Sequence, residues 1–204
     1  MRKTSAGRRP GGENALDETK RKIQRAAKEL IASQGYTATT IRQIARRVSM
    51  KGGSLYYHYP GKNEILFAIL DEGNQRLLDA ADRVMKSGLP DVPAILRGLV
   101  YEHVRILAGD PAQFMVVTRE LKRLKGGRHQ EIMAQRDRYE QIIQDVLRMG
   151  IRERTIRRCN VKVVSYGLIS LLNGVASWFD PRGPLSIERI ADEYVDVLLE
   201  GLRA

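Results

Sequence analysis

The segment 39–62, with the sequence TTIRQIARRVSMKGGSLYYHYPGK, constrains the fold more than any other part of the chain. Its first half carries apolar residues at helical spacing, and Thr39 or Thr40 can cap that helix. A second short helical stretch follows from about Lys51 to Tyr57, and Pro60 marks its end. Two short helices joined by a tight turn form a helix-turn-helix, whose second helix enters the major groove of DNA.

Positive charge gathers around this segment. Residues 1–62 hold 14 of the 35 lysines and arginines but only 4 of the 24 acidic residues, so they carry +10 of the net charge of +11. Residues 63–204 are therefore almost neutral. A basic unit joined to a neutral body is typical of a polyanion-binding head on a body with another task, although charge alone is equally typical of a solvated surface.

The rest of the chain continues to show helical spacing of apolar residues. No stretch shows the alternation of a strand, so the sequence predicts an all-α fold with about nine helices. Residues 1–15 are rich in Gly, Arg and Ser and are predicted to form a disordered basic arm. The expected parts are a helix-turn-helix DNA-binding domain at 16–62 and a larger effector-binding and dimerisation domain at 63–204. In the larger domain, after a long helix from about Lys62, helices are expected near 92–108, 111–124, 129–150, 161–179 and 187–202.

Several classes of protein are disfavoured by what the sequence lacks. A single cysteine, Cys159, excludes an internal disulfide and a multi-cysteine zinc site. No run approaches 18 apolar residues and no apolar signal stretch follows the basic N-terminus, so we expect a cytoplasmic protein without a membrane partner. Phosphate-binding loops and dinucleotide motifs are absent, and His58, His103 and His129 are scattered. We therefore expect no enzyme, no catalytic residue, no metal and no cofactor.

The second helix of the predicted motif presents small and hydroxylic residues. Gly52 and Gly53 have no side chain to read a base, but they let the backbone approach the floor of the groove. Lys62 stands at a helix start, where the helix dipole adds to its own charge. The side chains that can donate to phosphate oxygens are Thr40, Ser54, Tyr56, Tyr57, His58 and Lys62. For Tyr56 an alternative is that the ring supports the core.

The run 54–60, SLYYHYP, with Lys62 two residues on, resembles the DNA-binding signature of the TetR family of bacterial repressors. The run 40–45, TIRQIA, resembles it as well. The resemblance covers residues 20–66 in detail and the nine-helix plan across the chain. It implies a homodimer that binds a palindromic operator and carries an effector site in its body.

Carried over by position, the resemblance implies two kinds of DNA contact. Phosphates are assigned to Thr40, Tyr57, His58 and Lys62, and positions at or near base edges to Arg42, Lys51 and Ser54. Two positions depart from the family pattern. Ser49 stands where a turn glycine is usual, and Gly52 stands where a longer polar residue is common. The second departure leaves Arg42 as the best candidate for direct base reading.

The segments 161–179 and 187–202 are predicted to form a subunit interface. The second segment has one broad apolar face, and the first is apolar around much of its circumference, with Gly167 and Gly174 available for close helix approach. Burial inside one chain is the alternative. A four-helix bundle across a two-fold axis is favoured, because paired half-sites on DNA require two linked heads.

The helices between head and interface are predicted to hold an effector. Basic runs at 119–128 and 148–158 lie among apolar and aromatic residues, and an apolar cavity with a cationic rim suits an amphipathic anion. Each candidate taken alone is more often ordinary core or solvated surface. The candidate ligand-binding residues are Tyr101, His103, Phe114, Met115, Arg119, Arg123, Tyr139, Ile143, Leu172, Trp178 and Arg182.

A second resemblance concerns the effector. The runs 119–124, RELKRL, and 178–186, WFDPRGPLS, are similar to the branch of the family that senses acyl-CoA thioesters and regulates lipid or steroid breakdown. This implies an acyl chain in the cavity and CoA phosphates near the arginines. The alternatives are a repressor of drug efflux with a promiscuous pocket and a ligand-insensitive DNA-binding protein. Aromatic residues make up only 6% of the chain, which disfavours a broad stacking pocket for planar cations.

Overall fold

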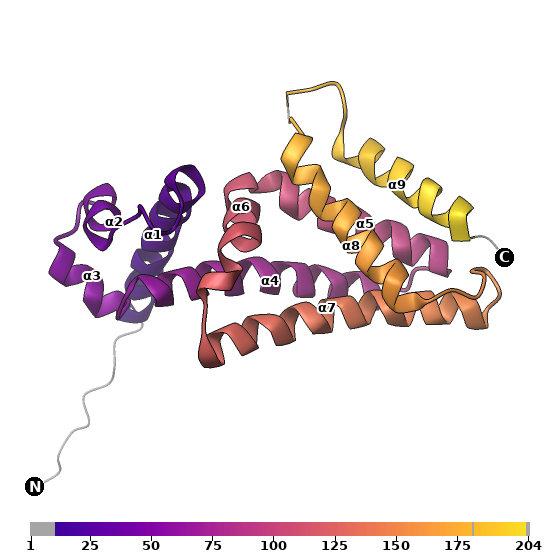
Figure 1. Cartoon of the computed structure of the whole chain (residues 1–204), viewed down its shortest axis with the longest axis horizontal. Coiled ribbons are helices and arrows are strands. Elements are labelled where there is room, and N and C mark those ends of the chain that lie inside the picture. The colour runs from indigo at the N-terminus through magenta and orange to yellow at the C-terminus, as the bar shows by residue number, and fades with distance from the viewer. Residues whose placement is uncertain (1–10, 181, 203–204) are drawn as a thin grey trace, which may run out of the picture. The chain divides into compact units, whose positions relative to one another are not determined.

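The computed structural model describes residues 11–180 and 182–202, and all regular structure in these ranges is helical (Figure 1). The predicted all-α fold with about nine helices is confirmed for these described ranges. The elements are α1 (Gly11–Gln34), α2 (Ile41–Arg47), α3 (Gly52–His58), α4 (Lys62–Lys86), α5 (Val92–Gly109), α6 (Pro111–Glu120), the 3₁₀ turn η1 (Leu121–Arg123), α7 (Gly126–Arg152), α8 (Val161–Trp178) and α9 (Ile187–Leu202). Of the arm predicted for residues 1–15, residues 1–10 lie outside the described residues and the last five begin α1.

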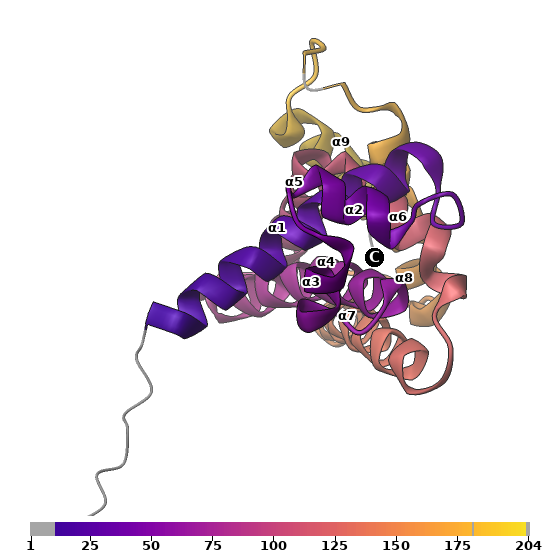
Figure 2. The ribbon, with the colours of Figure 1, turned by 90° about the vertical axis from the view of Figure 1, so that its left-hand side faces the viewer.

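The chain divides into two compact units between Ile69 and Leu70, a few residues beyond the boundary expected after residue 62. In the first unit α1, α2 and α3 pack on one another (Figure 2). Gly35 ends α1 with φ +83°, and its N–H donates to the carbonyl of Ile31 (2.9 Å), as a helix-terminating glycine does. The buried side chains of this unit include Ile23, Ala27, Ile31, Ile44, Ala45, Leu55, Ile65 and Leu66.

The second unit is organised around α5, which packs against α6, α7, α8 and α9 (Figure 1). The apolar face of α9 is largely used up inside the chain, because Ile190, Ala191 and Val195 are buried in the core shared with α5. Arg97 of α5 reinforces this packing by binding the carboxylates of Asp192 and Asp196 of α9. The apolar face of α9 was predicted to take part in a subunit interface. Much of this face therefore packs within one chain instead.

Helix α8 is long and apolar enough to cross a membrane by length and composition. The prediction from unbroken apolar runs did not anticipate this. Its polar residues nevertheless make contacts inside the second unit: Ser165 is fully buried and accepts from Gln144 (3.4 Å), and Asn173 contacts His103 (3.4 Å). Such internal contacts are those of a helix in a globular unit.

Candidate nucleic-acid interface and ligand cavity

Helix α2 begins at a capping box. The Oγ1 of Thr40 accepts from the N–H of Gln43 (3.2 Å), and the Oε1 of Gln43 accepts from the N–H of Thr40 (2.8 Å). This reciprocal pair satisfies two amide groups that the first turn of a helix leaves unbonded. The side chain of Thr40 is still exposed to solvent. The hydroxyl predicted to meet a phosphate thus also defines where α2 starts.

The turn between α2 and α3 passes through Ser49, whose φ is +56°. The N–H of Met50 donates to the carbonyl of Ala45 (2.8 Å) and closes the turn. A residue with a Cβ loses about 1–2 kcal/mol in this left-handed region, which glycine enters freely. Ser49 therefore occupies the conformation of a turn glycine.

The variant Ser49→Gly is expected to raise the free energy of unfolding by about 0.5–1 kcal/mol. Relief of strain is partly offset by the greater freedom of glycine in the unfolded chain. Denaturant unfolding of both proteins measures the difference. As a control, Ser33→Gly on the exposed side of α1 is expected to lower stability. A Ser49→Gly protein less stable than the wild type would contradict the assigned strain.

One side of helix α3 packs against the core of the first unit, and the other side is exposed to solvent. Leu55 is fully buried, and Tyr59, 8% exposed, lies just beyond the end of the helix. Tyr56 and Tyr57 are 55% and 76% exposed, so the aromatic ring that supports this core is that of Tyr59 rather than Tyr56. The exposed residues of the open side are Lys51, Gly53, Ser54, Tyr56 and Tyr57.

The two glycines at the start of α3 are not required by the fold. A Cβ added at Gly52 or Gly53 would meet no atom within 4 Å. Space in front of the first turn of α3 is therefore open, and a flat or grooved partner can approach the backbone closely there.

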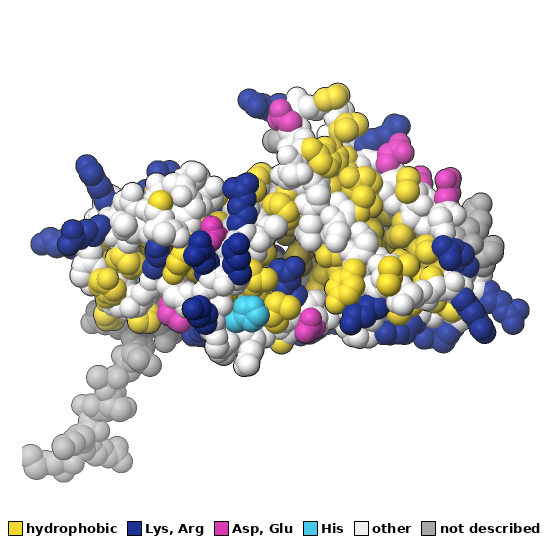
Figure 3. Space-filling view, viewed as in Figure 1, with side chains coloured by type: hydrophobic (Ala, Val, Ile, Leu, Met, Phe, Trp, Pro, Cys, Tyr) yellow, Lys and Arg dark blue, Asp and Glu magenta, His cyan; other side chains and the backbone are white. Residues whose placement is uncertain are grey.

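The first unit also presents exposed cations, and Figure 3 shows lysine and arginine side chains over it. Arg42 and Lys51 are exposed, and neither makes a hydrogen bond or ion pair with the described residues. Arg47, in contrast, is bound to Glu29 (2.7 Å) and links α2 to α1. Charge that is not neutralised within the chain is available to a polyanion.

Lys62 has its ammonium group inside the first unit. Its Nζ donates to the carbonyls of Tyr36 and Thr39, each at 2.7 Å, and lies 4.1 Å from the centre of the Tyr36 ring. His58 is half-buried with its ring edge-on to Tyr57, and its Nδ1 is buried without a hydrogen-bond partner in the described residues. The residues predicted to bind phosphate thus differ in their surroundings. The side chains of Tyr56 and Tyr57 are exposed to solvent, whereas the ammonium group of Lys62 is bonded to the loop before α2.

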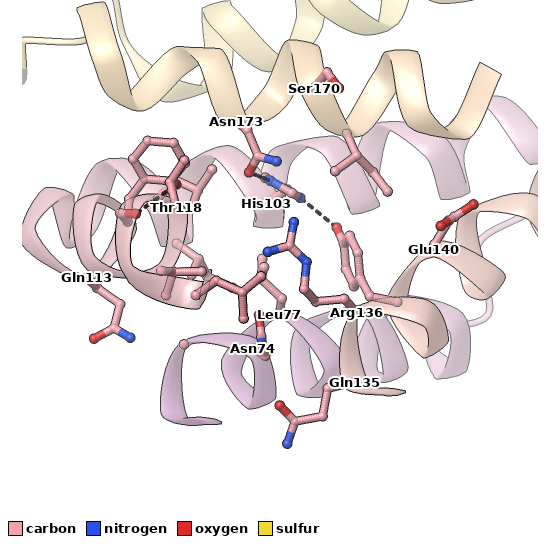
Figure 4. Close-up of a pocket in the computed structure, with 18 of the residues that line it drawn as sticks. Asn74, Leu77, His103, Gln113, Thr118, Gln135, Arg136, Glu140, Ser170 and Asn173 are labelled. Carbon is pink, nitrogen blue, oxygen red and sulfur yellow. Dashed lines mark hydrogen bonds between the residues drawn. The ribbon is translucent and has the colours of Figure 1, made fainter. Parts of the chain in front are cut away.

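The second unit contains a cavity of about 380 Å³, within the size range of small-molecule sites (Figure 4). Its walls come from α4, α5, α6, α7 and α8. The apolar part of the wall includes Leu77, Ile106, Leu107, Phe114, Val117, Met133 and Ile169. The polar part includes Asn74, His103, Gln113, Arg136, Tyr139 and Asn173.

A buried hydrogen-bonded group forms one side of the cavity (Figure 4). The Nδ1 of His103 lies 2.8 Å from the Oη of Tyr139, and its Nε2 lies 3.4 Å from the Oδ1 of Asn173. An amide oxygen can only accept, so Nε2 carries the proton and Nδ1 accepts from the tyrosine hydroxyl. Burial lowers the pKa of His103 to about 4 and raises the pKa of Tyr139. Both groups are therefore neutral at physiological pH.

The buried, neutral His103 predicts acid sensitivity. An unfolded chain binds a proton at an ordinary histidine below its usual pKa of 6.5, whereas the folded chain binds it only near pH 4. Stability from this group is present above pH 6.5 and is lost as the pH falls, at about 1.4 kcal/mol for each unit down to about pH 4. Denaturant unfolding of wild type and His103→Gln across pH 4–7 should show a flatter profile for the variant. Parallel profiles would contradict the assignment.

Arg136 extends from α7 into the cavity, with its guanidinium directed toward Leu77 and His103 (Figure 4). It is half-buried, and no carboxylate among the described residues pairs with it. Asn74 of α4 is 7% exposed, and its Nδ2 is buried without a hydrogen-bond partner in the described part of the chain. Within the described residues, the cavity wall thus includes a guanidinium without a counter-charge and, on α4, a buried amide group without a hydrogen-bond partner.

Comparison with known proteins identifies the family of this chain. The family model described as the tetracyclin repressor-like C-terminal domain matches residues 91–202, more than half of the chain, and the model of bacterial regulatory proteins of the tetR family matches residues 23–69. The chain belongs to the TetR family. TetR-family proteins are DNA-binding transcriptional regulators and not enzymes, so the family and the absence of a catalytic role were both predicted correctly.

Three proteins of known name are similar to this TetR-family chain over most of its length. The HTH-type transcriptional repressor KstR2 of Rhodococcus jostii (strain RHA1) is 25% identical over 178 residues, covering 86% of this chain and 87% of the relative. The fatty acid metabolism regulator protein of Bacillus subtilis (strain 168) is 21% identical over 179 residues, covering 87% and 92%. The solved structure of AibR in complex with isovaleryl coenzyme A and operator DNA matches with a TM-score of 0.80 and 25% identity, covering 88% and 97%.

Only some of the predicted ligand-binding residues line the cavity. His103, Phe114 and Tyr139 line it. Arg119 lines a shallower hollow with Thr118, Leu121, Lys122 and His129, and this hollow shares Thr118 and Leu121 with the cavity.

The other predicted ligand residues lie elsewhere. Ile143 and Leu172 are buried in the core, and Tyr101 donates to Glu188 of α9 (3.4 Å). The residues that do not line either hollow are Tyr101, Met115, Arg123, Ile143, Leu172, Trp178 and Arg182. Sequence reasoning missed Asn74, Arg136 and Asn173, because an isolated polar residue on a long helix gives no signal that it faces inward.

Arg42 remains the predicted base-reading residue of this TetR-family head. Arg42→Ala is expected to cost about 1–3 kcal/mol of binding free energy per half-site and to relax sequence preference, because one bidentate base contact is lost. Titration of specific and scrambled duplexes at several salt concentrations measures both effects. Arg46→Ala, an exposed neighbour one turn along α2, is the control. Equal losses on both duplexes for Arg42→Ala would remove it from base reading.

Proposed function

We propose that this TetR-family repressor binds a palindromic operator as a homodimer and is released by a small amphipathic effector. On this proposal residues 16–62 bind DNA in the cytoplasm and residues 63–204 bind effector and dimerise. The observation that carries it is the open side of α3, where hydroxyls and bare backbone are exposed to solvent, together with exposed Arg42 and Lys51, which have no partner among the described residues. The proposed DNA contacts are Thr40, Arg42, Lys51, Gly53, Ser54, Tyr56, Tyr57 and His58, and Lys62 is proposed to act through the loop that it closes.

The proposed dimer interface is centred on α8. Only 22% of this helix is buried within one chain, and Figure 3 shows hydrophobic side chains over it. Val163, Gly167, Leu171, Gly174 and Trp178 recur every three or four residues and so share one face. The three large residues are 64%, 42% and 48% exposed, and a Cβ at either glycine would meet nothing within 4 Å. A second copy of α8 can therefore approach this stripe closely.

The cavity supports an effector over the ligand-insensitive alternative, since a constitutive DNA-binding protein has no need of it. Acyl-CoA thioesters are the first candidates, because AibR binds isovaleryl coenzyme A and the relative from B. subtilis is named for fatty acid metabolism. An acyl chain would fill the apolar part of the cavity, and Arg119 and Lys122 in the adjoining hollow would face CoA phosphates. The low aromatic content of the chain, 6%, disfavours the efflux alternative, because a promiscuous pocket for planar cations stacks them on aromatic rings.

Release would be a shift of population. An effector that binds the dimer better with its heads wrongly spaced for DNA lowers operator affinity by that difference in binding free energy. Helix α4 is the proposed lever, because it runs from the first compact unit into the second and contributes Asn74 and Leu77 to the cavity wall.

Operator release tests this proposal. A long-chain acyl-CoA and the matching free acid are titrated into the protein bound to a selected operator duplex, and bound DNA is followed by fluorescence anisotropy. At least one of the two is expected to release the duplex. Tight operator binding that neither compound changes would defeat the effector part and favour the ligand-insensitive alternative.

A further inference from the structure

We propose that Arg136 and Asn74 form a carboxylate-binding subsite inside the cavity, so that the effector is an apolar molecule bearing a carboxylate at its inner end. This inference rests on the proposed effector role of the cavity and names the chemical class of its ligand. It concerns the inside of the cavity, not the basic hollow beside Arg119.

The first support is the charge on Arg136. A half-buried guanidinium is normally paired, because removing it from water is costly. The three acidic residues on the cavity wall are Asp110, Asp137 and Glu140.

Each of these acids is engaged elsewhere or open to water. Asp110 accepts from the N–H of Gln113 (3.0 Å) and faces Arg76 (3.6 Å). Glu140 accepts from Gln144 (2.5 Å) and from Ser165 (3.4 Å). Asp137 is exposed. The guanidinium therefore meets no internal counter-charge in the described part of the chain.

The second support is the amide of Asn74. Its Nδ2 is buried and makes no hydrogen bond with the described residues, which is costly unless a ligand supplies an acceptor. A carboxylate has two oxygens and about four acceptor positions, so it can accept from a guanidinium and an amide together. A thioester carbonyl carries no charge and would leave the guanidinium uncompensated.

The third support is the neutral opposite wall. Burial keeps His103 uncharged, and its Nδ1 and Nε2 are already engaged by Tyr139 and Asn173. Among the described residues that line the cavity, the one cationic side chain is therefore that of Arg136, and apolar residues such as Leu77 and Phe114 line the wall for the rest of the ligand. Two sources present this chemistry: a free fatty acid, and a CoA thioester whose acyl chain ends in a second carboxylate.

Calorimetry on the full-length protein tests the subsite with four probes: decanoic acid, 1-decanol, decanoyl-CoA and the CoA monothioester of decanedioic acid. The variants are Arg136→Met, which keeps length but removes charge, and Arg138→Met as control. Arg138 is on the same helix, is exposed, pairs with Asp82 (3.2 Å) and does not line the cavity. Circular dichroism checks that both variants are folded.

At least one of the two carboxylate probes should bind roughly 10- to 100-fold more tightly than its partner without an inner carboxylate, decanol or decanoyl-CoA. Arg136→Met should abolish that difference and Arg138→Met should keep it. Preference for decanoic acid identifies a free acid, and preference for the decanedioic thioester identifies a CoA ligand. The wild-type comparison stands even where Arg136→Met does not fold.

Three outcomes would overturn the subsite: no preference for a carboxylate in the wild type, a preference that survives Arg136→Met, or binding of decanoyl-CoA alone. The last would leave the proposed function intact, because decanoyl-CoA could still release the operator. Failure of the proposed function shows separately, as absence of sequence-specific duplex binding or of release by any effector.

Discussion

Leu171→Arg is expected to convert the dimer to a monomer and to lower operator affinity by roughly 10²- to 10⁴-fold. Leu171 lies in the middle of the exposed stripe on α8, and a charge there would be buried without a partner against the second copy. A monomer reaches one half-site at a time, so the gain from linking two heads is lost. Sedimentation velocity and duplex titration measure the two effects.

Met85→Arg is the matched control for this change. Met85 on α4 and Leu171 are each 42% exposed, so both substitutions place a charge at an equally accessible apolar position. We expect Met85→Arg to remain dimeric and to keep its operator affinity. A Leu171→Arg protein that stays dimeric would show that the subunits meet elsewhere.

Lys62→Met is expected to lower the free energy of unfolding by about 2–4 kcal/mol, because it removes two charge-assisted bonds to the carbonyls of Tyr36 and Thr39. These carbonyls belong to the loop between α1 and α2, so the position of α2 is affected as well. The affinity for the operator should therefore fall together with the free energy of unfolding. Denaturant unfolding, followed by duplex titration at several salt concentrations, separates the two consequences.

The salt dependence distinguishes the internal role of Lys62 from the phosphate role implied by the family resemblance. A lost phosphate contact lowers the slope of log affinity against log salt by about one and leaves stability unchanged. A lost internal contact lowers stability and leaves the slope unchanged. Lys51→Met removes an exposed lysine without an internal partner in the described residues. It should lower the slope of log affinity against log salt and leave the free energy of unfolding unchanged. Unchanged stability of Lys62→Met would contradict the internal role.

The helices were predictable because their signals are local. Apolar spacing and punctuation by Gly and Pro placed a helix at 187–202, where α9 is found, and one at 161–179, where α8 ends one residue earlier. Ser49 stands where a turn glycine is usual, and its φ of +56° lies in the left-handed region that favours glycine. Information that lies within a few residues is sufficient for such features.

The cavity was predictable only in part, because five helices supply its wall. Aromatic residues in the middle helices pointed to Phe114 and Tyr139, which do line it. A charge run pointed to Arg123, but consecutive charges on a surface mostly face solvent. The run 178–186 pointed to Arg182, which lies between α8 and α9 and pairs only with nearby Asp180 in the described residues. A lone arginine such as Arg136 becomes distinctive only when its surroundings in space are known.

The central claim is that the basic N-terminal unit binds duplex DNA of a specific sequence, and one measurement tests it most directly. Duplexes that bind the purified protein are selected from a randomised pool, and affinity for the selected sequence and a scrambled one is titrated at low and physiological salt without effector. We predict a palindromic sequence bound at least about 10³-fold more tightly than the scrambled duplex at physiological salt. Equal affinity for the two duplexes, even at low salt, would contradict the account.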